Sequence, residues 1–435
     1  MGGLGVGDLT VYMRIRLDYG TDGLEVELPE ERTTIIEPVF LEPLPNPHDA
    51  LVAALRAPIG RPPLRDLVRP GQKIAISVCD ITRPQPRPQM LRALFEEMPG
   101  VNPHDVTILI ATGTHRANNS DELQRMLGAD ILNRGCQIVN HDSRDDSTLA
   151  HVGETRAGVP IFLNKKWLAA DVRITTGFVG PHFFAGFSGG AKMVAPGLAG
   201  LKTVLVLHDA KRIGSPNATW GVIEGNPVQD DVREIARTTG VTFSIDVTLN
   251  RDQEITAVFA GELFAEHGQA CTFSKQSVMC PVDVPFDVVL TTNSGYPLDQ
   301  NLYQAVKGMS AAAKVVKSGG TIVCAAECRD GLPNHGSYGQ VLASRPTPAA
   351  LLEMINAPGY SVPDAWQVQV QAQIQVKAKV LVKNGFMSDT EIRAAHFEPV
   401  ADVRRGVNGA LESAGAAATL CVLPQGPQTI PYLRS

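Results

Sequence analysis

The chain has 435 residues, of which 44% are hydrophobic, and a formal net charge of −6 at pH 7. This length and composition predict two globular domains and exclude an intrinsically disordered chain. The negative net charge argues against a nucleic-acid partner, and no apolar run approaches the ~20 residues that a membrane-spanning helix needs.

The first block of the chain is typical of an α/β domain. Residues 10–30 predict a β-hairpin, and Asp49 is expected to cap the helix that follows it. Asn119 and Glu122 have the spacing of a capping box, which predicts another helix start. Further strands are expected at 73–80, 106–113, 136–142 and 172–177, and helices at 49–57 and 90–98. This alternation predicts a parallel sheet.

A second block begins near Pro281. Residues 367–383 alternate strictly in polarity, as in a strand, but their composition favours a helix, and we expect a helix followed by a strand. Other strands are expected at 286–295, 320–328 and 418–426, and helices at 301–316 and 340–358. We therefore expect two α/β domains with mainly parallel sheets, spanning residues 1–280 and 281–435 and flanking a central active-site cleft.

The cysteines and the first residues of the chain favour a reducing compartment, the cytoplasm. The seven cysteines include no Cys-x-x-Cys pair, which argues against a zinc finger and fits reduced thiols. The opening MGGLGVGDL lacks the basic start and apolar core of a secretory signal. We expect a cytoplasmic protein.

The glycine-rich stretch from Gly177 to Gly200 is the strongest candidate for a functional loop. It follows an expected strand, where α/β proteins place their chemistry, and its glycines allow the backbone to approach a bulky ligand closely. Lys192 in this stretch is expected to bind a phosphate or to anchor a ligand covalently. The stretch is not a P-loop, because Ala191 stands where that motif needs glycine and Met193 where it needs Ser or Thr.

Three histidines are candidates for chemistry. His115 and His182 each follow an expected strand and are predicted to act as acid and base, the alternative being structural roles. His208 is expected to be a metal ligand or a core residue, and as a single histidine it would need a cofactor to supply the other donors. The remaining histidines are expected at the surface: 48, 104, 141, 151, 267, 335 and 396.

Two cations are candidates for holding a carboxylate. Arg83 can bind one through two hydrogen bonds, although it can equally pair with Asp80. Lys307 adds a point charge, and it shares one helix face with Tyr303 because the two are four residues apart.

Five segments of this chain resemble the lactate racemase family that uses a nickel-pincer nucleotide. They are, in order, DITRP (80–84), GTHR (113–116), PHFFAGFSGGAK (181–192), LHD (207–209) and LYQAVKG (302–308). The spacing from His182 to Lys192 and from Lys192 to His208 matches as well, and the resemblance runs from about residue 10 to the end.

The resemblance implies a role for each matching position. Lys192 would hold the cofactor, a pyridinium-3-thioamide-5-thiocarboxylic acid mononucleotide, through a thioamide link, and His208 would be the protein ligand of its nickel ion. His115 and His182 would be the paired catalytic acid and base. The implied substrate and cofactor contacts are Asp80, Arg83, Tyr303, Gln304 and Lys307 for the substrate, and Trp366 for the cofactor.

The implied activity is a racemase or epimerase of a 2-hydroxy acid, which transfers hydride reversibly to the cofactor through a 2-keto acid. Ala191 departs from the arginine of the family's lactate enzymes, which leaves lactate, malate and related acids open. A second substrate carboxylate would want another cation, for which Arg87 and Arg116 are candidates, although solvated arginines are the simpler interpretation.

The expected partners are a small-molecule substrate and the maturation proteins that install the cofactor, with no nucleic acid and no membrane. Two other hypotheses remain open: a nicotinamide-dependent 2-hydroxyacid oxidoreductase and a non-catalytic cofactor-binding relative. The absence of a GxGxxG motif that opens a helix after a strand speaks against the first.

Overall fold

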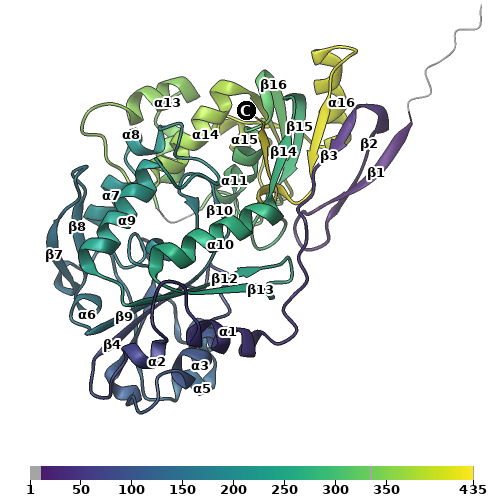
Figure 1. Ribbon diagram of the computed structural model, residues 1–435. Helices are drawn as coiled ribbons and strands as arrows, with labels where there is room; N and C mark the ends of the chain where they lie inside the picture. Colours follow the sequence, from purple (N-terminus) through teal and green to yellow (C-terminus); the bar gives the residue numbers. More distant parts are fainter. Residues whose placement is uncertain (1–10, 334–335, 435) are drawn as a thin grey trace, which may run out of the picture. The chain divides into compact units, whose positions relative to one another are not determined.

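The computed structural model describes residues 11–333 and 336–434. It divides into two compact units: a middle unit, Val39–Ser277, and a terminal unit, which joins the chain up to Pro38 to the chain from Val278 onward. Both units contain a mainly parallel sheet with helices, so the predicted α/β class is confirmed (Figure 1).

The middle unit is built on a six-stranded sheet of order β13-β12-β9-β4-β5-β6, in which only the β12–β13 pair is antiparallel. The sheet strands are β4 (Ile74–Cys79), β5 (Val106–Ala111), β6 (Gln137–Asn140), β9 (Val172–Phe178), β12 (Phe243–Leu249) and β13 (Ile255–Gly261). Two hairpins accompany it: β7 (Leu149–Glu154) with β8 (Pro160–Asn164), and β10 (Pro181–His182) with β11 (Gly186–Phe187).

Helices cover both faces of this sheet. Figure 1 shows α1, α3 and α5 on one face and α9 and α10 on the other. The helices of the unit are α1 (Pro47–Arg56), α2 (Leu64–Leu67), α3 (Arg87–Glu96), α4 (Ser120–Leu127), α5 (Ala129–Leu132), α6 (Lys165–Leu168), α7 (Leu201–Leu207), α8 (Ala210–Ile213), α9 (Pro227–Thr239) and α10 (Leu263–Val278). Because both faces are covered, every residue of β4 is buried, as a central parallel strand requires.

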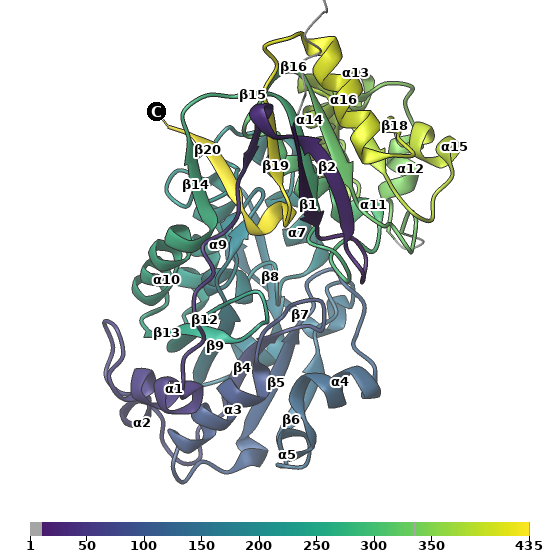
Figure 2. The same cartoon turned by 90° about the vertical axis from the view of Figure 1, so that its right-hand side faces the viewer.

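The terminal unit has a second six-stranded sheet, of order β18-β17-β16-β15-β19-β3, and all its pairs are parallel. Its strands are β3 (Thr33–Ile35), β15 (Phe286–Thr292), β16 (Val316–Ala325), β17 (Lys379–Lys383), β18 (Glu398–Pro399) and β19 (Leu420–Leu423). The hairpin β1 (Tyr12–Leu17) and β2 (Leu24–Pro29) and the pair β14 (Met279–Val282) and β20 (Ile430–Leu433) lie beside it (Figure 2). Its helices are α11 (Leu302–Ala312), α12 (Tyr338–Ala343), α13 (Pro348–Ile355), α14 (Ala365–Lys377), α15 (Asp389–Ala394) and α16 (Val403–Ala414).

The structure divides the chain differently from the expected 1–280 and 281–435. The first strands belong with the C-terminal part, because β3 pairs with β19 and the apolar faces of β1 and β2 pack into the core of that sheet. A contact between the two ends of a chain leaves no local signal in the sequence, which is why the prediction missed it.

The helices and strands agree with the predicted elements at some positions and differ from them at others. The helix-then-strand interpretation of residues 367–383 is correct, as is the capping box of Asn119 and Glu122. Asp49 is not a cap, because α1 already begins at Pro47, whose fixed backbone angle suits a first helical position. Residues 340–358 form two helices, α12 and α13, where one was expected.

Among the residues that the structure describes, none of the helices combines the length and the apolar character needed to cross a bilayer.

We predict that Gly308→Ala lowers the free energy of unfolding by about 1–3 kcal/mol, because the new methyl group would overlap the carbonyl oxygen of Thr292, against which α11 packs. Urea unfolding measures this. The matched control is Gly409→Ala on α16, whose methyl group would meet no atom within 4 Å, so it should raise the stability by up to ~1 kcal/mol. Equal stability of Gly308→Ala and the natural chain would contradict the packing described.

Candidate active site

The middle unit pairs Asp80 with His115 at the carboxyl ends of neighbouring strands. Asp80 follows β4, His115 follows β5, and Asp80 Oδ2 lies 2.6 Å from His115 Nδ1. Burial alone would raise the pKa of Asp80, but the hydrogen bond from His115 and the charge of Arg83 bring that pKa below its usual value. The carboxylate therefore accepts the Nδ1 proton, and this leaves the basic lone pair of neutral His115 on Nε2.

Arg87 holds the loop that carries Asp80. It is 5% exposed, and it donates to the carbonyls of Cys79 at 2.7 Å, Arg83 at 2.7 Å and Gln85 at 3.1 Å, and also to that of Asp80. The expectation of a solvated Arg87 is therefore wrong, because the tight turn after β4 leaves carbonyls that need a donor.

The other two arginines near this loop are also engaged. Arg116 donates to both oxygens of Glu122, at 2.6 and 2.8 Å, and this bond lowers the pKa of Glu122 to about 2. Arg83 donates to Thr82 Oγ1 at 2.9 Å, and it acts on Asp80 through its charge.

His182 has the opposite tautomer to His115. Its Nδ1 accepts the backbone N–H of Ala185 at 3.2 Å, so the proton of the neutral ring is on Nε2. The ring centroid of Phe184 lies 4.5 Å from that of His182 and 5.1 Å from that of His208. The structure thus brings two of the predicted histidines against one aromatic ring.

His208 is kept neutral beside Lys192. It follows α7 as its C-cap, where its N–H donates to the carbonyl of Val204 at 3.0 Å. Burial and, to a smaller extent, the charge of Lys192 lower the pKa of His208 to about 3. A neutral imidazole is the form that binds a metal ion.

The donor set fits a cofactor-borne metal ion. Within the described parts of the chain, no group of three or more His, Cys, Asp or Glu side chains is placed to hold a metal. A metal ion at His208 would therefore need donors from a bound group, and Lys192 is the neighbouring side chain that can carry such a group.

The segment around Lys192 crosses the ends of β4 and β5. Ser77 Oγ donates to the carbonyl of Met193 at 2.7 Å, and the N–H of Gly113 donates to the carbonyl of Gly197 at 3.0 Å. These bonds tie the lysine segment to the strands that end at Asp80 and His115. Met193 and Ala191 are both buried, so the residues on either side of Lys192 face the interior.

The glycine turn before Lys192 is not a phosphate cradle. The N–H of Gly190 donates to Asp246 Oδ2 at 2.7 Å, so a carboxylate of the chain occupies the place that a phosphate would need.

The terminal unit gathers the other predicted residues on α11 and α14. Asn301 caps α11, and Lys307 Nζ donates to Gln304 Oε1 at 2.6 Å. Trp366 Nε1 donates to the hydroxyl of Tyr303 at 3.3 Å. The predicted common helix face of Tyr303 and Lys307 is consistent with α11, and Trp366 joins it from the start of α14.

Sequence reasoning missed a buried polar group behind the lysine turn. Asp246 on β12 and Glu266 and His267 on α10 are 1%, 0% and 8% exposed. The expectation that His267 lies at the surface is therefore wrong. The same expectation is wrong for His141, which is 1% exposed and whose Nε2 lies 2.9 Å from the carbonyl oxygen of Ala199. His335 lies outside the described residues. The available signal was Asp246 itself, an acidic residue within the apolar run FSIDVTL.

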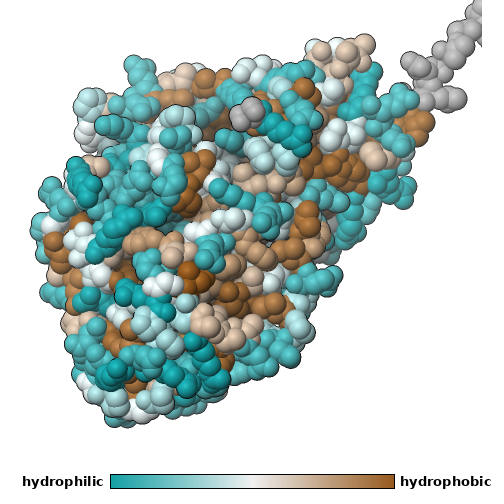
Figure 3. Space-filling model, viewed as in Figure 1, coloured by the Kyte–Doolittle hydropathy of each residue, from teal (hydrophilic) through white to brown (hydrophobic). Residues whose placement is uncertain are grey.

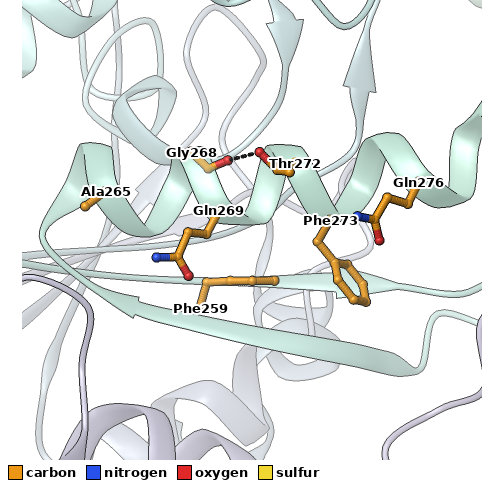
Figure 4. A pocket seen from close by; sticks show the side chains of 7 residues that line it. All are labelled: Phe259, Ala265, Gly268, Gln269, Thr272, Phe273 and Gln276. Carbon is orange, nitrogen blue, oxygen red and sulfur yellow. Dashed lines mark hydrogen bonds between the residues drawn. The ribbon is translucent and has the colours of Figure 1, made fainter.

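A groove between β13 and α10 has a lining of apolar and uncharged polar side chains, unlike the site around Lys192. Figure 4 shows Phe259 and Phe273 side by side beneath the helix, and their ring centroids are 5.7 Å apart. The seven lining residues include no ionisable side chain: Phe259, Ala265, Gly268, Gln269, Thr272, Phe273 and Gln276. In Figure 3, hydrophobic and hydrophilic side chains are interspersed on the face shown. The groove therefore offers no acid–base chemistry.

The fold is that of an α/β protein whose middle unit holds two histidines in opposite tautomers and a third, buried histidine beside a lysine. Residues 19–221 match the lactate racemase N-terminal domain, and residues 282–430 match the lactate racemase C-terminal domain. The chain belongs to the lactate racemase family, and it is therefore an isomerase.

Individual relatives agree with this assignment. The chain is 38% identical to a lactate racemase of Lactiplantibacillus plantarum over 87% of this chain and 89% of that protein. It is 33% identical to a lactate racemase of Thermoanaerobacterium thermosaccharolyticum over 96% and 98% of the two chains. The solved structure of the lactate racemase apoprotein from that organism has a TM-score of 0.90 and covers 97% of this chain and 100% of that one. A protein from Thermotoga maritima, with a TM-score of 0.68, 18% identity and coverage of 91% and 100%, shares the fold.

We predict that the stability of the protein falls as the pH rises from 5 to 8, in part because of Glu266 and Asp246. Burial raises the pKa of both carboxyl groups, and their mutual repulsion raises that of Glu266 further. Between the unfolded and folded pKa values the folded chain binds more protons than the unfolded chain, so raising the pH favours unfolding. Urea unfolding at several pH values measures the slope.

Glu266→Gln should flatten this slope, because an amide does not titrate. The control is Glu412→Gln, at an exposed position on α16, which should keep the slope of the natural chain. The same slope in Glu266→Gln and the natural chain would refute the assignment.

Proposed function

We propose that this isomerase is a racemase of a 2-hydroxy acid that works with a nickel-pincer nucleotide linked to Lys192. The observation that carries the proposal is the pair of histidines in opposite tautomers. A racemase must take a proton from a hydroxyl and return one, and the two histidines offer their Nε2 atoms for this: that of His115 bears the free lone pair, and that of His182 bears the proton. The names of the relatives support the same activity.

The cofactor would be held by Lys192 covalently and by His208 through its neutral imidazole, with Trp366 as a proposed aromatic contact. When bound, it supplies an acceptor for the hydrogen of the chiral carbon together with its electron pair. This chemistry suits a 2-hydroxy acid, because removing that hydrogen as a proton would place a second negative charge next to the carboxylate.

The protein's own part is to move the hydroxyl proton and to orient the substrate. Nε2 of His115 takes the hydroxyl proton of one enantiomer while Asp80 stabilises the charged ring. After the planar 2-keto acid turns, Nε2 of His182 in its protonated, cationic form returns a proton to the oxygen and the ring becomes neutral. The reverse direction exchanges the two roles, so each ring alternates between its neutral and its cationic form. Arg83 is proposed to bind the single carboxylate, and Lys307, held by Gln304, to add its charge to that same carboxylate, with Tyr303 also lining the substrate site.

Lactate is favoured over malate as the substrate. Malate has a second carboxylate, and the two arginines considered for it are engaged, Arg87 by backbone carbonyls and Arg116 by Glu122. A monocarboxylate needs neither. The proposed substrate class is therefore a small 2-hydroxy monocarboxylate such as lactate.

We predict that the chain gains the mass of the nucleotide at Lys192, and about one nickel ion, when it is co-expressed with the cofactor-making maturation proteins. Intact-protein and peptide mass spectrometry with metal analysis measure both. Lys192→Arg should gain neither, because an arginine cannot form the thioamide. The control is Lys202→Arg, since Lys202 is exposed and pairs with Asp146, and it should gain both. An adduct on Lys192→Arg, or none on the natural chain beside a working maturation control, would overturn the proposal.

We also predict that Asp80→Asn lowers kcat in both directions by roughly 10²- to 10⁴-fold with a smaller effect on KM. Asparagine keeps the shape but lacks the charge that holds the Nδ1 proton of His115 and stabilises its charged form. Chiral chromatography of lactate measures the rates. Arg14→Gln, which breaks an exposed ion pair with Glu27 in the other unit, is the control and should stay within about twofold of the natural chain. An unchanged kcat for Asp80→Asn would remove the acid–base assignment.

A further inference from the structure

The turn of residues 188–190, which precedes Lys192, has an unusual backbone conformation. Gly189 and Gly190 have φ angles of 75° and 54°, in the left-handed region that favours glycine. Two consecutive glycines can adopt several backbone conformations in isolation. The side chains that contact the turn must therefore stabilise the conformation that sets the direction of Lys192.

Asp246 contacts this turn from β12. Its Oδ2 accepts the N–H of Gly190 at 2.7 Å. A Cβ atom on Gly189 would lie 2.8 Å from Oδ2, and one on Gly177 would lie 2.5 Å from Oδ1. The carboxyl group is therefore wedged between the end of β9 and the turn, with no room for a side chain on either glycine.

His267 contacts the same turn from α10. Its Nε2 lies 2.8 Å from the carbonyl oxygen of Ser188, and because a carbonyl only accepts, Nε2 carries the proton. A Cβ atom on Gly190 would lie 2.6 Å from Cγ of the His267 ring. Two side chains from different elements thus bind consecutive peptide groups of the turn, one accepting and one donating.

These contacts are made in spite of a cost in stability. Asp246 Oδ1 and Glu266 Oε2 are buried without a hydrogen-bond partner among the described residues, and an uncompensated buried carboxyl group is unfavourable. Apolar side chains would fill this space more stably. Stability therefore does not explain why polar groups stand here, whereas their hydrogen bonds to the turn before Lys192 do.

We infer that Asp246 and His267 are positioning residues that fix the turn and so set the direction in which Lys192 reaches the cofactor. This inference rests on the proposed role of Lys192 as the anchor. Both residues act through the backbone of the turn, and neither needs to touch the substrate.

The test is the reactivity of Lys192 in the protein without cofactor. Acetylation by an N-hydroxysuccinimide ester, followed by peptide mass spectrometry, gives the rate at Lys192 relative to that at exposed Lys202 in the same digest. Asp246→Ala should change this ratio by at least about threefold, and Asp246→Asn, which keeps an acceptor for the N–H of Gly190, should stay near the natural value.

A second pair of variants covers the case in which Asp246→Ala does not fold. His267→Leu loses the donor to the carbonyl of Ser188 and should change the ratio, whereas His267→Gln keeps a donor and should restore it. The stability control is Glu97→Gln, a fully buried carboxyl group paired with Arg56 and Arg65, which should leave the ratio unchanged.

Cofactor loading separates the two proposals. If the natural chain gains the adduct, Asp246→Ala and His267→Leu should gain it at a yield lower by about tenfold, with Asp246→Asn near natural. If the natural chain gains no adduct, the proposed function fails whatever the labelling shows. Unchanged Lys192 reactivity and natural adduct yield in both Asp246→Ala and His267→Leu, or a Glu97→Gln effect of equal size, would overturn the positioning role.

Discussion

The site in the middle unit depends on one constraint: the segment that carries Lys192 is tied across the carboxyl ends of β4 and β5. Two hydrogen bonds do this, from Ser77 to the carbonyl of Met193 and from Gly113 to the carbonyl of Gly197. They fix the lysine relative to the strands from which Asp80 and His115 emerge. The relative placement of residues from three loops depends in part on these bonds, and the proposed chemistry depends on that placement.

The tautomers of His115 and His182 follow from the hydrogen-bond partner of each Nδ1 atom. A carboxylate at Nδ1 of His115 and a backbone N–H at Nδ1 of His182 give the two Nε2 atoms opposite character without any difference in residue type. The third histidine, His208, is neutral for another reason, since burial and Lys192 both oppose its charge. Three identical side chains thus have three environments, and the proposed roles of base, acid and metal ligand rest on this difference.

The sequence predicted the parts of this account that have local signals. Central strands are apolar runs, the cap at Asn119 has a fixed spacing, and the family motifs surround Lys192 and the histidines. It did not predict that Arg87 is buried, because its partners are backbone carbonyls that no pattern marks. Nor did it find Asp246 and His267, which meet the lysine turn only once β12 and α10 have packed.

The most direct measurement of the central claim uses lactate that carries deuterium on its chiral carbon. The loaded enzyme would convert one enantiomer to the other in ordinary water, and mass spectrometry of the product would follow the label. A product that retains deuterium is expected, because the hydrogen leaves and returns with its electron pair and only the hydroxyl proton passes through the histidines. Loss of the label to solvent, or no conversion by protein that carries nickel and the nucleotide, would contradict the account.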